Sequence, residues 1–121
     1  MRRSTYEKGN RGEALAAAYL KAHGFEIVRA RYRAGRGDID IVAREGEILV
    51  FCEVKARDSD LFGEPEHAVT RAKQRKIRRI AEAYLFEHDL RDQVCRFDVI
   101  AIRFPDQGGG APRIRHHRNA F

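Results

Sequence analysis

The spacing of apolar and polar residues divides the first half of the chain into one helix and three extended segments. Apolar residues recur at helical spacing between about residues 10 and 23, and Gly24 follows as a helix stop. Segments with the composition or alternation of strands follow at residues 25–32, 38–43 and 48–56. The short connection at 44–47 predicts that the last two of these segments form a hairpin.

The second half of the chain predicts a long amphipathic helix and further strands. Thr70 is a candidate N-cap for a helix that ends near His88. The apolar stripe of this helix comprises Ile77, Ile80, Ala81, Tyr84 and Leu85. Its opposite side is basic and comprises Arg71, Arg75, Lys76, Arg78 and Arg79. The segment 96–104 is almost continuously apolar, as in a strand buried on both faces, and 113–121 is a candidate edge strand.

This order of elements predicts an α/β fold in which helices flank a mixed central sheet. The centre of the sheet would hold the segments 38–43, 48–56 and 96–104. The length of 121 residues is that of one domain, so residues 1–121 are predicted to form a single domain. A loop with Gly63 and Pro65 precedes the second helix, and a Gly-rich loop spans 105–112.

Charge indicates a class of partner that the hydrophobic pattern does not. Lys and Arg total 24 against 18 Asp and Glu, which gives a net charge of +6 and an isoelectric point near 9.7. This balance favours a polyanionic partner such as nucleic acid, and the alternative is that the charge serves solubility alone.

Cysteine usage and hydropathy predict a cytoplasmic protein. Cys52 and Cys95 lie inside apolar runs, as small buried side chains do in a reducing compartment, and no spacing typical of a zinc site occurs. The sequence has no signal peptide of the usual form and no apolar run long enough to span a bilayer, so no membrane partner is expected.

Two carboxylates and a lysine stand where predicted strands emerge from the core. Strand periodicity places Glu53 and Lys55 on one face, with Val54 on the other. Asp38 and Asp40 are likewise predicted to share a face of the neighbouring strand, and the hairpin would bring Asp40 and Glu53 within reach of one ion. Mg²⁺ or Mn²⁺ held there would stabilise the charge that develops in phosphodiester hydrolysis, and Lys55 would orient the attacking water. The alternative is a cross-strand salt bridge from Lys55 to either carboxylate, and spacing alone favours that alternative at least equally.

A wider set of motifs resembles the YraN family of small bacterial proteins. The motifs are Gly9-Asn10-Arg11-Gly12-Glu13, Gly37-Asp38-Ile39-Asp40, Phe51-Cys52-Glu53-Val54-Lys55-Ala56-Arg57, Phe62-Gly63, Lys73-Gln74, Arg96-Phe97-Asp98-Val99 and Asn119-Ala120-Phe121. The resemblance covers nearly the whole chain. It implies a restriction-endonuclease-like fold akin to archaeal Holliday junction resolvases, with Asp40, Glu53 and Lys55 as a PD-(D/E)xK nuclease signature. The chain departs from the family pattern at Asp38, where Glu is usual, and at Cys52, where Val is usual.

The same resemblance adds Glu13 as a residue that would complete the catalytic site. The alternative for Glu13 is a carboxylate at a helix start that interacts with the helix dipole.

Basic and polar residues near this site are candidates for phosphate contacts, and the set comprises Arg33, Arg36, Arg57, Lys73 and Gln74. A solvated basic face is the preferred interpretation of Gln74. For His116 and His117, a surface edge is preferred to a metal site, and Asp98 is interpreted as a satisfied buried carboxylate.

These observations predict a Mg²⁺- or Mn²⁺-dependent endonuclease that acts on DNA, branched or damaged DNA in particular. A non-catalytic nucleic-acid-binding module of the same fold is the main alternative, and RNA cleavage is a third. Symmetric cleavage of a four-way junction would call for a homodimer. The sequence identifies no dimer surface, although the basic second helix and the loop 58–69 are candidates.

Overall fold

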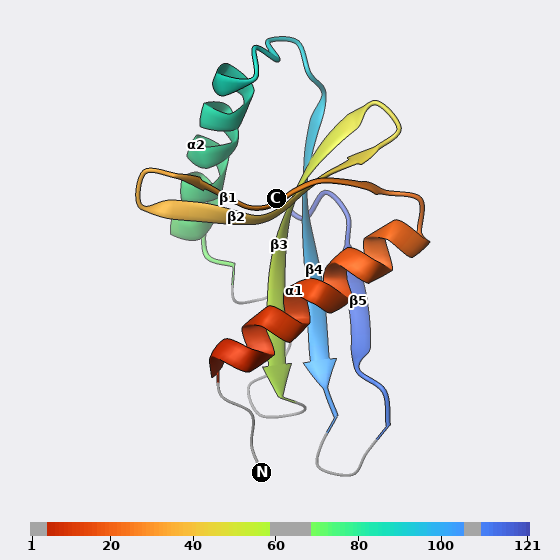
Figure 1. Ribbon diagram of the computed structural model, residues 1–121. Helices are drawn as coiled ribbons and strands as arrows, with labels where there is room; N and C mark the ends of the chain where they lie inside the picture. Colours follow the sequence, from red (N-terminus) through yellow and green to blue (C-terminus); the bar gives the residue numbers. More distant parts are fainter. Residues whose placement is uncertain (1–4, 59–68, 106–109) are drawn as a thin grey trace.

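The computed structural model describes residues 5–58, 69–105 and 110–121, which form two helices and a five-stranded sheet (Figure 1). The elements in chain order are α1 (Thr5–Ala22), β1 (Glu26–Ala34), β2 (Gly37–Glu45), β3 (Ile48–Asp58), α2 (Arg71–Glu87), β4 (Cys95–Phe104) and β5 (Arg113–His117). The strand order is β1-β2-β3-β4-β5, with β3 and β4 parallel and the other neighbours antiparallel. This confirms the predicted mixed sheet flanked by helices, and it is consistent with a restriction-endonuclease-like fold.

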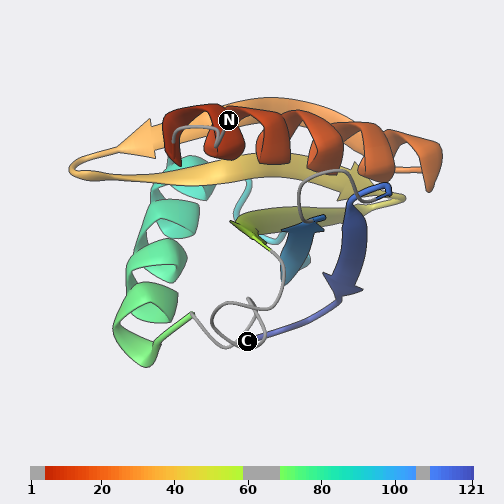
Figure 2. The same cartoon turned by 90° about the horizontal axis from the view of Figure 1, so that it is seen from below.

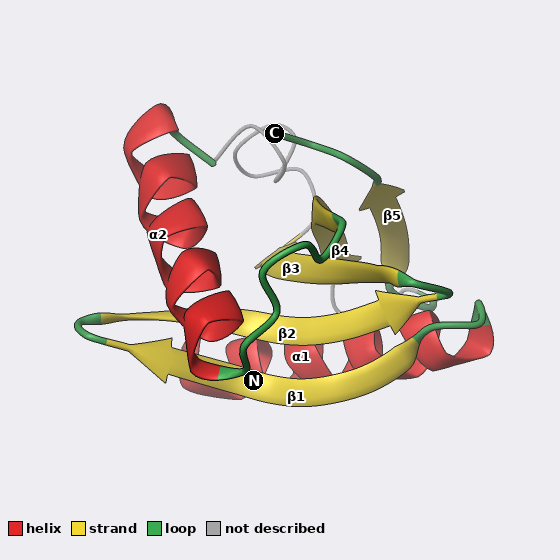
Figure 3. Ribbon diagram, turned by 90° about the horizontal axis from the view of Figure 1, so that it is seen from above, coloured by secondary structure: helices red, strands yellow, loops and turns green. Residues whose placement is uncertain are grey.

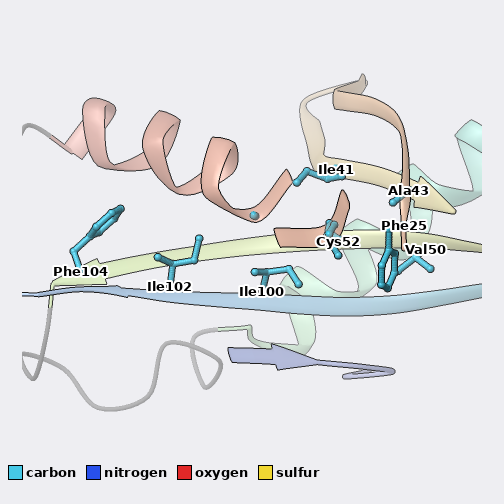
Figure 4. Close-up of a cluster of buried hydrophobic side chains, with 10 residues drawn as sticks. Phe25, Ile41, Ala43, Val50, Cys52, Ile100, Ile102 and Phe104 are labelled. Carbon is cyan, nitrogen blue, oxygen red and sulfur yellow. The ribbon is translucent and has the colours of Figure 1, made fainter. Parts of the chain in front are cut away.

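The two helices cover opposite faces of the sheet (Figures 2 and 3). Beneath α1, Ala16 and Leu20 pack on a cluster that Figure 4 shows projecting from the strands toward the helix, including Phe25, Ile41, Ala43, Val50, Cys52, Ile100, Ile102 and Phe104. Beneath α2, the predicted apolar stripe meets a second cluster that includes Tyr32, Ile39, Val42, Leu49 and Phe51. The middle strands β2, β3 and β4 are therefore apolar on both faces.

Two glycines let the helices approach the strands that carry the candidate site. A Cβ atom at Gly12 of α1 would lie 2.8 Å from the Cβ of Ala56 on β3. A Cβ atom at Gly37 of β2 would lie 2.7 Å from Cδ1 of Ile80 and 2.6 Å from Cε of Lys76 on α2. The contact of Gly12 is closer than a side chain permits, so the absence of a side chain there fixes how near α1 sits to β3. At Gly37 the neighbouring atoms are the ends of the Lys76 and Ile80 side chains, which could shift.

The sequence placed the start of α1 too late. The helix begins at Thr5 rather than near residue 10, because Gly9 and Gly12 lower helix propensity and mask the signal. Tight packing of Gly12 against β3 outweighs that propensity. The predicted N-cap Thr70 is confirmed, since its side chain accepts a hydrogen bond from the Lys73 N–H at 3.2 Å.

The predicted edge strand is confirmed, since β5 lies at the edge of the sheet, but the side chain of His116 is not at the surface as was expected. His116 has a side-chain exposure of 5%, because it packs against Tyr19 and Phe25 from the α1 side of the sheet and contacts Asp98. Both cysteines are free thiols, Cys52 fully buried and Cys95 partly buried. Neither helix of the described chain has the length and apolarity needed to cross a bilayer.

Several sequence predictions concern segments outside the described residues. These are the loop with Gly63 and Pro65, the Phe62-Gly63 motif and residues 106–109 of the Gly-rich segment 105–112.

Candidate functional site

The candidate site lies where β2 leaves β3. The β2–β3 ladder ends at the pair Ile41 and Cys52, one position before Asp40 and Glu53 would face each other. Beyond this point β3 still pairs with β4, as far as Asp58. On its other side, the Val54 N–H donates a 2.7 Å hydrogen bond to Oδ2 of Asp40. At Val54, the backbone N–H of β3 is therefore bonded to the Asp40 side chain and not to a backbone carbonyl of β2. This hydrogen bond holds Asp40 next to Glu53.

The regular alternation of β2 is interrupted at Asp40. Ile39 packs in the cluster beneath α2, whereas Ile41 packs beneath α1, although residues two apart in a regular strand share a face. The predicted shared face for Asp38 and Asp40 rested on that alternation, which does not hold here. Arg31 lies opposite this point on β1 and has a φ of 52°, in the left-handed region that a side chain rarely adopts.

A single oxygen of Glu53 attracts two lysines. The Nζ atoms of Lys55 and Lys73 both lie 3.6 Å from Oε1 of Glu53, whose side chain is 6% exposed. Lys55 follows Glu53 by two positions on β3, so the predicted shared face is confirmed. Lys73 arrives from the first turn of α2, where the Thr70 cap holds its backbone. The predicted Glu53–Lys55 salt bridge therefore exists, and α2 adds a second cation to it.

Asp40 lies among other carboxylates. Its partial burial and the neighbouring Glu53 charge raise its pKa to about 7, against the opposing effect of the Val54 hydrogen bond. The charges of Glu13 and Asp38 raise the pKa of Asp40 further. A carboxyl group with this environment binds a proton near neutral pH, and it would release that proton to a metal ion.

Glu13 lies in the electrostatic neighbourhood of Asp40 but pairs with another residue. Its Oε2 accepts a 2.8 Å hydrogen bond from Nη2 of Arg31, the residue with positive φ on β1. Glu13 also lies well inside α1, which begins at Thr5, so the interpretation as a helix-start carboxylate is wrong. Glu13 therefore has a cationic partner in Arg31, and its negative charge still raises the pKa of Asp40.

The other predicted contact residues lie around the site rather than in it. Arg33 and Arg36 are exposed on the β1–β2 hairpin. Arg33 lies near the end of β1, and Arg36 lies in the turn. Arg57 is exposed on β3 and donates a hydrogen bond to the carbonyl oxygen of Ala56. Gln74 donates through Nε2 to the Val69 carbonyl oxygen, so it braces the entry to α2. Of the predicted phosphate contacts, the structure thus brings Lys73 directly to Glu53.

The donor chemistry of the site fits a hard divalent cation. Mg²⁺ takes oxygen ligands and is usually held by one or two carboxylates, with water and substrate oxygens completing its shell. Asp40 and Glu53 provide two such carboxylates. Within the described ranges, no three His, Cys, Asp or Glu side chains gather into a group that could hold a metal ion without other ligands. The site therefore suits an ion shared with substrate rather than an all-protein cage.

The interpretation of Asp98 as a satisfied buried carboxylate is confirmed, but its partners escaped sequence reasoning, as did the exposed Arg31–Glu13 pair. Arg96 donates from Nε and Nη2 to Asp98 at 2.8 and 2.9 Å, and Nε2 of His116 lies 2.7 Å from the same carboxylate. Arg96 and Asp98 are two positions apart on one strand and so share a face, which could have predicted their pairing. The Arg31–Glu13 pair and the His116 contact join distant segments and left no local signal.

Comparison with other proteins places the chain in a family. Residues 12–102 match the model of "Uncharacterised protein family UPF0102", which is the YraN family. A UPF0102 protein of Geobacter metallireducens is 45% identical over 113 residues, covering 93% of this chain and 90% of the relative. A UPF0102 protein of an Arthrobacter species is 46% identical over 110 residues, covering 91% and 92%. With a match over most of its length and relatives of this similarity, the chain belongs to the UPF0102 family.

Proposed function

We propose that this protein is a metal-dependent endonuclease that hydrolyses phosphodiester bonds of DNA, with Asp40, Glu53 and Lys55 as its catalytic residues. The observation that supports this best is the placement of Asp40 and Glu53 side by side at the point where β2 leaves β3. Neighbouring carboxylates repel each other and are costly to desolvate, as the raised pKa of Asp40 indicates. A divalent cation would relieve that cost.

In this proposal Asp40 and Glu53 would hold Mg²⁺ or Mn²⁺. When bound, the ion would stabilise negative charge on the phosphate and lower the pKa of a coordinated water. The Val54 N–H keeps the Asp40 carboxylate in one orientation, so the site is ordered before substrate arrives.

The two lysines complete the proposed chemistry. The Lys55 side chain is 17% exposed and its ammonium is held next to Glu53, where it can orient a water or stabilise charge on the phosphate. The Lys73 side chain is 36% exposed, and this greater exposure suits attraction of the phosphate group. The resemblance to the PD-(D/E)xK signature supports the same assignment of Asp40, Glu53 and Lys55.

One observation favours the alternative of a non-catalytic nucleic-acid-binding module. Glu53 already has two cationic partners, Lys55 and Lys73, so part of its charge is balanced without a metal ion. In that alternative the site is an ion-pair network on a basic binding surface. The two functions differ in their dependence on metal.

The experiment is cleavage of a labelled panel of duplex, single strand, flap, four-way junction and structured RNA, with Mg²⁺ or Mn²⁺. Wild type is compared with Asp40→Asn and Lys55→Met, and with exposed controls Asp92→Asn and Lys21→Met that make the same changes away from the site. Metal-dependent cleavage that both site variants lose and both controls keep would support the nuclease. Binding without cleavage in wild type, unchanged in Asp40→Asn, would reject it in favour of the binding module.

A further inference from the structure

The first half of α2 concentrates positive charge. Its residues 71–79 include six Lys or Arg and no Asp or Glu, and the first acid of the helix is Glu82. The net charge of the whole chain is +6, so this short segment holds as much uncompensated charge as the entire molecule.

Three of these cations form one row on the outer side of the helix. Arg71, Arg75 and Arg79 follow one another at intervals of four residues, the spacing of neighbours on a helix surface, and all three are exposed. We call this row the α2 arginine stripe. The buried residues of α2 lie on its other side, centred on Ile77 and Tyr84. Lys73 also faces inward, toward Glu53, so the stripe and the carboxylate site lie on different sides of α2.

The stripe works against the stability of its own helix. Like charges four residues apart repel each other, and the stripe contains two such pairs. Cations near a helix N-terminus also oppose the helix dipole, and the first turn of α2 contains no acid to offset Arg71. In the part of the chain that the structure describes, no ion pair joins a stripe arginine to a carboxylate.

Some arginines elsewhere in the molecule have structural partners. Arg31 pairs with Glu13, and Arg96 pairs with Asp98 and Glu45. Even on α2, Arg78 lies over the rings of Phe97 and Phe121. Among the described residues, the stripe arginines therefore have no carboxylate partner that would offset their mutual repulsion, which makes the stripe a candidate surface for an anion from outside the chain.

We propose that the α2 arginine stripe binds the phosphate backbone of a nucleic-acid segment distinct from the one at Asp40 and Glu53. The stripe spans about 12 Å of helix, and successive phosphates of one DNA strand rise by about 3.4 Å, so its guanidinium groups can contact a short run of neighbouring phosphates. The partner class rests on the proposed function, whereas the surface itself does not. A second surface on the far side of α2 suits a substrate with more than one arm.

The test measures binding of a fluorescent duplex and a fluorescent four-way junction by anisotropy, in EDTA, at several NaCl concentrations. The stripe variant is Arg71→Gln/Arg75→Gln/Arg79→Gln. The matched control removes the same charge from exposed positions outside α2 and is Lys21→Gln/Arg91→Gln/Arg113→Gln. Thermal unfolding of both is recorded, and the stripe variant is expected to melt no lower than the control.

We expect the stripe variant to flatten the slope of log affinity against log salt by about 2 to 3 and to weaken binding about tenfold or more. The control should flatten it by less than about 1. Equal slopes in the two variants would overturn the proposal, because binding would then follow net charge alone. Binding of wild type to anionic phospholipid vesicles but to neither DNA would overturn nucleic acid as the partner.

The outcome is separable from that of the nuclease proposal. A steep slope that the stripe variant loses, together with no cleavage by wild type, would keep this surface and reject the nuclease. Cleavage by wild type with equal slopes in the two triple variants would reject this surface alone.

Discussion

Two aspartates on strands that flank β3 have opposite electrostatic environments. Asp98 on β4 is fully buried and receives hydrogen bonds from Arg96, from the Asn119 backbone N–H and from His116. Burial alone would raise its pKa, but the His116 and Arg96 contacts outweigh it and lower the pKa to about 2. Asp40 on β2 has one backbone N–H and several carboxylate neighbours, and its pKa is raised to about 7.

The two aspartates differ in whether their oxygens remain available to bind a proton or an ion. The hydrogen bonds of Asp98 are saturated by groups of the protein, so an ion would have to displace them. Among the described residues, Asp40 has neighbouring carboxylates and no salt bridge, and its raised pKa leaves it able to bind a proton or a cation near neutral pH. Burial of a carboxylate does not by itself indicate function.

The largest effect is expected from Asp98→Ala. The substitution leaves the Arg96 guanidinium without its main partner in the interior, so we expect a loss of about 3–5 kcal/mol in the free energy of unfolding. Denaturant titration measures it, with the exposed Asp92→Ala as control. A loss below about 1 kcal/mol would show that the Asp98 network is not a structural centre.

The pH dependence of the free energy of unfolding in acid tests the same role of Asp98. The pKa of Asp98 is about 2, below its value in an unfolded chain, so its contribution is present above about pH 4 and is lost as the pH falls toward 2.

Asp40→Asn is expected to stabilise the protein near neutral pH. The pKa of Asp40 is raised in the folded state, so its contribution is full below about pH 4 and is lost as the pH rises through about 7. Asn keeps an oxygen for the Val54 N–H and removes the repulsion with Glu53. We expect a gain of about 1–3 kcal/mol at pH 8 and none at pH 4, measured by denaturant titration without metal. Equal effects at both pH values would contradict the assigned cause.

A divalent cation should distinguish the two aspartates by a smaller effect. At ten times its dissociation constant, Mn²⁺ should stabilise wild type by about 1.4 kcal/mol, because it binds the folded state alone. The shift in melting temperature should be larger at pH 8 than at pH 6, since protons compete for Asp40. It should be absent in Asp40→Asn and present in Asp92→Asn, and a shift that survives in Asp40→Asn would place the ion elsewhere.

The smallest effect is expected from Glu13→Gln. Removing this charge should lower the pKa of Asp40, with a titration midpoint less than about one pH unit below that of wild type. NMR titration of the Asp40 carboxyl carbon measures the midpoint. The Arg31 pair is exposed, so the free energy of unfolding should change by less than about 1 kcal/mol. An unchanged midpoint would remove Glu13 from the site.

The sequence predicted the elements well because their signals are local. The apolar stripe of α2, the Thr70 cap and the apolar β3 and β4 strands follow from periodicity and composition within short windows. The shared face of Glu53 and Lys55 follows from strand geometry in the same way.

The remaining features depend on contacts between distant segments. The approach of Gly12 to Ala56, the His116–Asp98 contact and the arrival of Lys73 at Glu53 each join separate elements. The alternation of β2 is interrupted at Asp40, where β2 turns away from β3. The sequence pattern of one strand does not indicate where its pairing with a neighbouring strand ends. The candidate residues were therefore predictable from sequence, whereas their partners were not.

The sheet topology has a consequence for the order of folding. β1, β2 and β3 are consecutive and joined by short turns, so their pairing closes small loops, whereas β3 and β4 pair in parallel across α2 through residues as distant as Leu49 and Cys95. Pairing over long separations is slow, because more chain entropy is lost before contacts form. We therefore expect the β2–β3 hairpin to bring Asp40 beside Glu53 early in folding. The hydrogen bonds of Asp98 with Arg96 and His116 would form later, when β4 and β5 complete the sheet.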